Sequence, residues 1–234
     1  MKSIDRKPFI TIFLQKPHGT NPMKLTLFLC FFISISFRIT GQATDWTTWY
    51  ERSGKTETPR YDATIEYCKR LDAASPLIHY TTFGHSEQGR ELPLMILDRD
   101  GLTDPDSIRR AGRTLLLVQA CIHPGESEGK DAGLMLFRDL AIGGGRLYTS
   151  GLLDQVTLLF IPIFNADGHE RFGPWNRINQ NGPREMGWRT NAMNLNLNRD
   201  YLKADSREMQ AWLKMFNAWD PDFFVDCHTT DGAD

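Results

Sequence analysis

The feature that most constrains the fold is a set of short apolar runs separated by segments with helical spacing. Three runs, residues 115–120, 155–164 and 223–227, are rich in Leu, Val, Ile and Phe without strict polar alternation, which is typical of strands covered on both faces. Two earlier runs, 77–83 and 92–97, flank a turn-rich segment and predict a hairpin. Strands that alternate with helices predict an α/β fold, with a mostly parallel or mixed central sheet and helices on both faces.

Three segments have the apolar spacing of amphipathic helices, residues 61–71, 126–141 and 205–219. The second ends at three consecutive glycines, which favour helix termination. The third is expected to begin at a capping box formed by Asp205 and Glu208. In folds of this kind, ligands bind at the carboxyl ends of the strands, so polar residues at those ends are the candidates for a functional site.

Composition excludes one class of partner. The chain has 234 residues, of which 41% are hydrophobic and 24% charged, and its formal net charge is -2. These values are typical of a globular protein with one core. The basic residues are scattered and form no stripe, so the sequence predicts no nucleic-acid partner.

The most apolar run, residues 25–37, is shorter than the roughly 20 residues of a membrane-spanning helix. It follows a short basic start at Met23, and small residues end at Ala43, so a signal peptide is predicted over residues 23–43. We expect a secreted or periplasmic protein without stable membrane insertion. Residues 1–22 do not resemble an export signal and are expected to be an upstream extension. An uncleaved amino-terminal anchor is the alternative.

Three cysteines remain after removal of that signal, Cys68, Cys121 and Cys227. An odd number in an oxidising compartment allows one disulfide at most. Cys121 and Cys227 each end a predicted strand, so they are the candidate pair. The alternative is that both are small, buried apolar residues with free thiols.

Three potential metal ligands follow two of the predicted strands. His123 and Glu126 come after the run 115–120, and His228 comes directly after the run 223–227. Two imidazoles and one carboxylate suit a catalytic zinc ion, which keeps one position open for water. We therefore expect these residues to bind about one zinc ion per chain. Taken singly, the histidines could be structural, and Glu126 could favour a helix amino terminus.

Five motifs, in this order, resemble the zinc carboxypeptidases of the carboxypeptidase A type. They are Gly-x-Ser-x-x-Gly-Arg-x-Leu at 84–92, His-Pro-Gly-Glu at 123–126, Asn-Ala-Asp-Gly at 165–168, Leu-Asn-Arg at 197–199 and Val-Asp-Cys-His at 225–228. The resemblance runs from about residue 61 to the end. It implies that residues 60–234 belong to the catalytic domain and that residues 44–59 are a connecting arm.

The resemblance also implies roles for three polar residues. Asn198 and Arg199 match the pair that holds the terminal carboxylate of the substrate, a task suited to a planar guanidinium. Arg189 resembles the arginine that stabilises the developing oxyanion. Arg177 and Arg184 lie near enough in the sequence to compete for that role. As isolated residues, these arginines would be solvated surface charges, and the 165–168 motif would be a structural turn.

Two departures from the family pattern stand out. Asp200 follows Arg199 where the family often has Asn. The sequence ends soon after His228, whereas the family continues to further strands, the specificity pocket and a general-base glutamate. We therefore expect the amino-terminal part of a catalytic domain, inactive by itself, with an unpaired sheet edge.

The function implied by the resemblance is that of a secreted zinc metallocarboxypeptidase. Such an enzyme hydrolyses the carboxy-terminal bond of a peptide or protein with a free carboxyl terminus, using a zinc-activated water. One alternative is a zinc-dependent deacylase of small N-acyl amino acids, against which the expected export and the Arg-rich segment 171–199 both weigh. The other alternative is a non-catalytic exported protein that binds a metal or a peptide.

Overall fold

The computed structural model describes residues 44–142, 151–178 and 180–229. The expected upstream extension and signal peptide lie outside these residues. The chain divides into two units at Asp45, and the description below concerns the second unit, Trp46–Asp234. Within the described ranges, no helix has the length and apolar character needed to cross a membrane.

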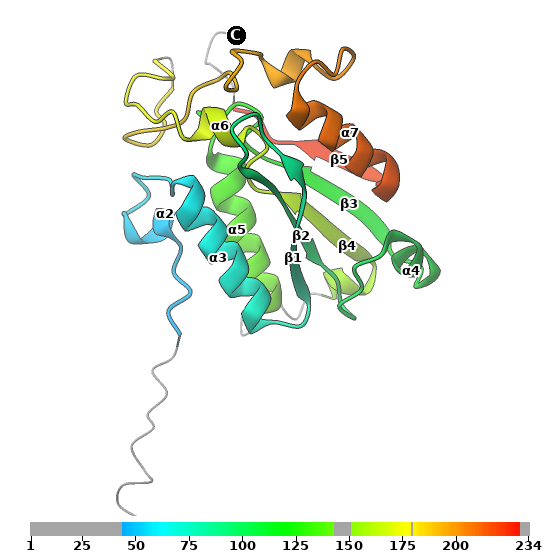
Figure 1. Cartoon of the computed structure of the whole chain (residues 1–234). Helices are drawn as coiled ribbons and strands as arrows, with labels where there is room; N and C mark the ends of the chain where they lie inside the picture. Colours follow the sequence, from blue (N-terminus) through cyan, green and yellow to red (C-terminus); the bar gives the residue numbers. More distant parts are fainter. Residues whose placement is uncertain (1–43, 143–150, 179, 230–234) are drawn as a thin grey trace, which may run out of the picture. The chain divides into compact units, whose positions relative to one another are not determined.

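The second unit contains a five-stranded mixed sheet with the order β1-β2-β4-β3-β5 (Figure 1). Its strands are β1 (Ile78–His85), β2 (Glu91–Leu97), β3 (Thr114–Gln119), β4 (Val156–Ile161) and β5 (Phe223–Asp226). The predicted hairpin is present, because β1 pairs antiparallel with β2. Strand β2 is also antiparallel to β4, whereas β3 is parallel to both β4 and β5. The α/β prediction is confirmed, and the sheet is mixed.

Helices cover both faces of the sheet. The helices of this unit are α2 (Trp49–Arg52), α3 (Tyr61–Ala74), α4 (Pro105–Arg110), α5 (Glu128–Ala141), α6 (Ala166–His169) and α7 (Arg207–Trp219), with short 3-10 helices η1 (Leu152–Asp154) and η2 (Leu197–Arg199). Helices α3 and α5 lie on one side of the sheet and α7 on the other (Figure 1). Helices α3 and α5 contribute to one apolar cluster, and α4 and α7 contribute to another. The sheet therefore lies between two helical layers.

Alternate residues of the inner strands supply both clusters. In β4, Leu158 and Phe160 belong to the cluster of α3 and α5, whereas Leu159 and Ile161 belong to that of α4 and α7. Each such buried side chain contributes about 1.5–3 kcal/mol relative to exposure. Because successive strand residues face opposite sides, a strand buried on both sides must be apolar throughout. This confirms the interpretation of the continuous apolar runs for β3 and β4.

The same interpretation is wrong for β5. Its residues Phe223, Phe224 and Val225 are 65%, 37% and 45% exposed. In the part of the chain that the structure describes, β5 pairs with β3 along one edge, and its other edge has no strand beside it. The expected unpaired sheet edge is therefore found at β5, and it carries exposed apolar side chains.

The start of α7 differs from the prediction. Ser206 is the N-cap, and its hydroxyl accepts a hydrogen bond from the backbone N–H of Met209 (3.2 Å). The predicted box of Asp205 and Glu208 does not form, since Glu208 is buried and accepts a hydrogen bond from Asn191 (3.2 Å). A serine beside an aspartate offers two equivalent caps in sequence, and tertiary contacts decide between them.

Part of the connecting arm packs on the core. Trp46 lies edge-on to Tyr67 with ring centroids 6.4 Å apart, and its carbonyl accepts a hydrogen bond from the Tyr67 hydroxyl (2.7 Å). Helix α2 then begins at a capping box formed by Thr48 and Glu51. Trp49 remains 50% exposed. The arm therefore anchors through its first tryptophan.

Two of the sequence motifs are joined by a buried carboxylate. Asp167 lies in α6, directly after β4, and is 1% exposed. Its Oδ1 accepts hydrogen bonds from the Ser86 hydroxyl (2.7 Å) and from Arg90 Nη1 (2.7 Å), and its Oδ2 accepts one from the backbone N–H of Gln88 (3.0 Å). The turn of the β1–β2 hairpin is thus fixed to the carboxyl end of β4.

A second buried polar contact joins the arm, α5 and α6. Lys130 is fully buried, and its Nζ donates to the carbonyl of Pro59 (2.6 Å) and lies 2.9 Å from His169 Nε2. Burial and the nearby Lys130 charge lower the pKa of His169 to about 3. His169 is therefore neutral at pH 7. It accepts at Nε2 and donates from Nδ1 to Glu170 Oε1 (3.1 Å).

This arrangement predicts a loss of stability in mild acid. His169 has an ordinary pKa near 6.5 when unfolded and a lowered one when folded, so below pH 6.5 only the unfolded chain gains its proton. The contribution of His169 to the free energy of unfolding should therefore fall by up to about 1.4 kcal/mol per pH unit as the pH drops from 6.5 toward 3. Urea denaturation between pH 7 and pH 4 measures this dependence. The free energy of unfolding should change less with pH in His169→Gln than in His79→Gln, in which an exposed histidine is replaced. Equal slopes in the two variants would contradict this assignment.

Candidate metal centre

The residues of the centre lie on two loops that leave neighbouring parallel strands at the same end. After β3, the chain turns at Cys121, which has a positive φ of 56°, and continues through His123 and Glu126. Helix α5 starts only at Glu128, so Glu126 lies on the loop and not in the predicted helix. His228 lies two residues after the end of β5, the parallel neighbour of β3. Adjacent parallel strands thereby bring together residues that are far apart in sequence.

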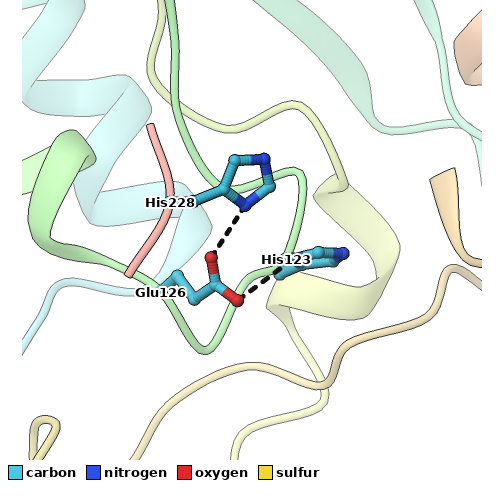
Figure 2. Close-up of side chains that lie close together, drawn as sticks. All are labelled: His123, Glu126 and His228. Atoms are coloured by element: carbon cyan, nitrogen blue, oxygen red, sulfur yellow. Dashed lines mark hydrogen bonds and ion pairs between the residues drawn. The ribbon is translucent and has the colours of Figure 1, made fainter. Parts of the chain in front are cut away.

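The structure places His123, Glu126 and His228 in direct contact (Figure 2). Nδ1 of His123 lies 3.0 Å from Glu126 Oε1, and Nδ1 of His228 lies 2.9 Å from Glu126 Oε2. One ligand atom from each residue lies within 4.8 Å of the other two. His123 and Glu126 are 3% exposed, whereas the His228 side chain is 34% exposed. The cluster is therefore open to solvent on the side of His228.

The opposite nitrogen of each histidine has its own partner. His123 Nε2 donates to Asn196 Oδ1 (3.1 Å), and His228 Nε2 lies 3.2 Å from Asp226 Oδ2. These contacts fix both rings with Nδ1 directed toward Glu126. Two imidazole nitrogens, a carboxylate oxygen and outer hydrogen-bond partners form a donor set that zinc prefers. The residues present therefore fit a zinc ion.

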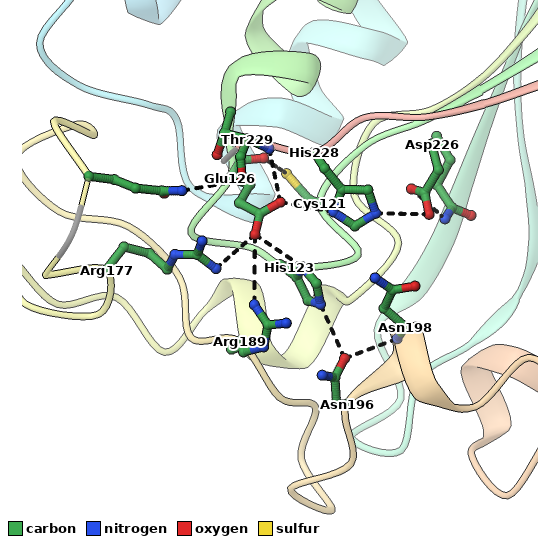
Figure 3. Close-up of polar contacts among 12 residues, drawn as sticks. Cys121, His123, Glu126, Arg177, Arg189, Asn196, Asn198, Asp226, His228 and Thr229 are labelled. Atoms are coloured by element: carbon green, nitrogen blue, oxygen red, sulfur yellow. Dashed lines mark hydrogen bonds and ion pairs between the residues drawn. The ribbon is translucent and has the colours of Figure 1, made fainter. Parts of the chain in front are cut away.

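Two of the three candidate arginines approach Glu126 (Figure 3). Arg177 Nη1 is 2.7 Å from Glu126 Oε1, and its side chain is 11% exposed. Arg189 Nη1 is 3.8 Å from the same oxygen, and its side chain is 40% exposed. Arg184 instead pairs with Glu57 (3.1 Å) and is 71% exposed. The structure therefore puts both Arg177 and Arg189 at the centre.

The predicted carboxylate-binding pair lies on η2. The backbone N–H of Asn198 donates to Asn196 Oδ1 (3.0 Å), which links this residue to His123. Arg199 is exposed, and its guanidinium donates to the carbonyl of Asn198 (2.8 Å). Asp200, the departure from the family pattern, accepts hydrogen bonds from the backbone N–H and hydroxyl of Ser206 (3.0 and 2.7 Å). Its carboxylate thus fixes the following loop.

The carboxylate of Glu126 is strongly favoured over its acid form. Burial alone would raise its pKa, but the contacts with His123 and His228 and the hydrogen bond from the backbone N–H of Thr229 (3.1 Å) outweigh burial and lower the pKa to about 2. The group is therefore charged at neutral pH, as a metal ligand must be.

The neighbouring cysteines are free thiols. Burial raises the pKa of Cys121 to about 12, and burial also raises the pKa of Cys227. Both thiols are therefore in the protonated form at neutral pH. Cys121 and Cys227 form no disulfide in the structure.

Sequence reasoning missed three contacts of the centre. Asp226 could have been inferred, because it precedes His228 by two residues and so shares its strand face. Asn196 and the contact of Arg177 with Glu126 involve loops without periodicity, and no spacing rule identifies them.

Solved structures share this fold at low sequence identity. A metallo-carboxypeptidase from Burkholderia cenocepacia aligns with a TM-score of 0.57 and 24% identity over 73% of this chain and 41% of its own. One from Pseudomonas aeruginosa aligns with a TM-score of 0.55 and 24% identity over 73% and 40%. Bovine thrombin-activatable fibrinolysis inhibitor aligns with a TM-score of 0.57 and 12% identity over 75% and 62%. The chain thus spans about two fifths of the length of the two bacterial proteins.

No curated protein matches the chain. The model of one protein family, described as zinc carboxypeptidase, matches residues 64–231, which include all three potential metal ligands. With this match and the shared fold, the chain belongs to the zinc carboxypeptidase family.

Proposed function

We propose that this protein is an exported zinc metallocarboxypeptidase that acts on peptides with a free carboxyl terminus. The observation that carries the proposal is the convergence of His123, Glu126 and His228 in a chain of the zinc carboxypeptidase family. Export is supported by the apolar run 25–37, with its basic start and small residues at its end.

The residues divide into three tasks. His123, Glu126 and His228 would hold zinc, which when bound supplies a Lewis acid and lowers the pKa of a water to about 7. Arg189 has a partly exposed guanidinium near Glu126, suited to stabilising the negative charge that develops on the substrate carbonyl oxygen. Asn198 and Arg199 would hold the terminal carboxylate, and the exposure of Arg199 leaves its guanidinium accessible to a substrate.

The proposal predicts a requirement for a free carboxylate. The zinc-loaded product of the whole gene should release single amino acids from peptide acids, and a chelator should stop the release. Arg199→Ala should reduce kcat/KM for peptide acids by about 10-fold or more, because a charge-assisted hydrogen bond is worth roughly 1.5–3 kcal/mol. Lys203→Ala, at an exposed residue nearby, is the control. Equal cleavage of amidated peptides and peptide acids by the parent enzyme would refute the proposed substrate class.

A further inference from the structure

The side chain of Arg177 crosses the metal-ligand loop at a residue that has no side chain. Gly125 lies directly before Glu126, and a Cβ atom at this position would come within 2.4 Å of Arg177 Cγ and 3.0 Å of Cδ. Gly125 is not among the residues with positive φ, so its backbone conformation does not require glycine. Glycine is required here because the aliphatic part of the Arg177 side chain passes too close for a Cβ atom.

Because the Arg177 side chain passes over Gly125, its guanidinium reaches one carboxylate oxygen of Glu126. Oε1 of Glu126 lies 2.7 Å from Arg177 Nη1 and 3.0 Å from His123 Nδ1. The other oxygen, Oε2, contacts His228 Nδ1 (2.9 Å) and the backbone N–H of Thr229 (3.1 Å). Each carboxylate oxygen of Glu126 therefore contacts a different histidine, and Arg177 binds the oxygen that contacts His123.

The segment that carries Arg177 is fixed on both sides. Before it, Asn176 donates to the carbonyls of Arg171 (2.8 Å) and Met186 (2.7 Å). After it, Gln180 donates to the carbonyl of Thr229 (3.3 Å), next to His228. The segment thus contacts the loop after β3 through Arg177 and the loop after β5 through Gln180. A guanidinium held in this way gives up little side-chain entropy when it binds Glu126.

We propose that Arg177, seated over Gly125, is a positioning residue that orients the carboxylate of Glu126 for the metal. The inference rests on the proposed zinc site and adds a role that the five sequence motifs do not assign. A buried ion pair at 2.7 Å restrains rotation of the carboxylate more strongly than the longer contact of the more exposed Arg189. Outer partners of metal-ligating side chains typically change metal affinity by about 10- to 100-fold when removed.

The test is equilibrium zinc affinity, measured by competition with a chromophoric chelator on the 234-residue chain. Arg177→Ala should weaken zinc binding by about 10-fold or more, and Arg177→Lys should bind more tightly than Arg177→Ala. Gly125→Ala should weaken binding similarly, because the new methyl group displaces the arginine. Added to Arg177→Ala, the same glycine change should cost less than about 3-fold, since the new methyl group then meets only the Gly187 carbonyl oxygen at 3.3 Å.

Two substitutions on the same segment serve as matched controls. Arg184→Ala removes an exposed guanidinium, and Gly182→Ala adds a methyl group that meets only the flexible end of Met186 (3.3 Å). Both should keep zinc affinity within about 2-fold of the parent. Parental affinity in Arg177→Ala, or full additivity with Gly125→Ala, would overturn the positioning role while leaving the zinc site intact. Failure of the parent chain to bind zinc would instead refute the zinc site, and with it the inference.

Discussion

Replacing His123 and His228 together by alanine is expected to reduce bound zinc from about one ion per chain to none. The substitutions remove two of the three ligands and leave a single carboxylate, which is too weak a donor set to hold zinc against buffer and water. Metal analysis after equilibrium dialysis measures the effect directly. The experiment needs no substrate, so it tests the centre independently of peptidase activity.

The matched control is His79→Ala with His85→Ala, which also removes two imidazoles but from exposed positions in β1. That variant should retain the zinc content of the parent. Unchanged zinc content in the His123 and His228 variant would show that other residues bind the ion. Loss of zinc in both variants would indicate adventitious binding to histidines and not a defined centre.

The position of this centre could be predicted because strand ends are readable from sequence. The apolar runs that became β3 and β5 fixed where His123 and His228 leave the sheet, and parallel pairing then placed them at one edge. The boundaries were less accurate, since α5 begins at Glu128 and the centre's carboxylate lies on a loop. The error did not affect the ligand assignment, because Glu126 lies within two residues of the start of the helix in either case.

The burial of β5 could not be predicted from its composition. Phe223 and Val225 have the same apolar character as residues of β3 and β4, yet both are largely exposed. An apolar run indicates that a strand can be covered on both faces. How exposed the strand is depends on which neighbours pair with it and pack on it. Contacts between loops could not be predicted either. The pairing of Arg177 with Glu126, for example, depends on the path of a long irregular segment.

The hairpin and the turn after β4 are a different case, because two predicted motifs proved to be one structural unit. Asp167 comes from the 165–168 motif, and Ser86 and Arg90 come from the 84–92 motif. The residue types of the 165–168 motif alone predict a turn. The structure shows that its aspartate also receives hydrogen bonds from a hairpin about 80 residues earlier.

Asp167→Ala is therefore expected to lower the free energy of unfolding by about 3 kcal/mol or more. The Asp167 side chain is fully buried, and its loss leaves the Ser86 hydroxyl and the Gln88 N–H without their acceptor. Arg90 is 31% exposed and can recover part of its hydration, which places the effect near the lower end of the range for broken buried pairs. Urea denaturation at pH 7 measures the change.

The control for this last effect is Asp106→Ala, because Asp106 is 75% exposed and pairs with Arg109 at 3.7 Å on the surface. It should change stability by no more than about 0.5 kcal/mol. Arg90→Ala combined with Asp167→Ala should cost less than the sum of the single changes, since both remove one ion pair. A loss below about 1 kcal/mol for Asp167→Ala would mean that water or a rearranged Gln88 satisfies the hairpin, and that the two motifs are not energetically coupled.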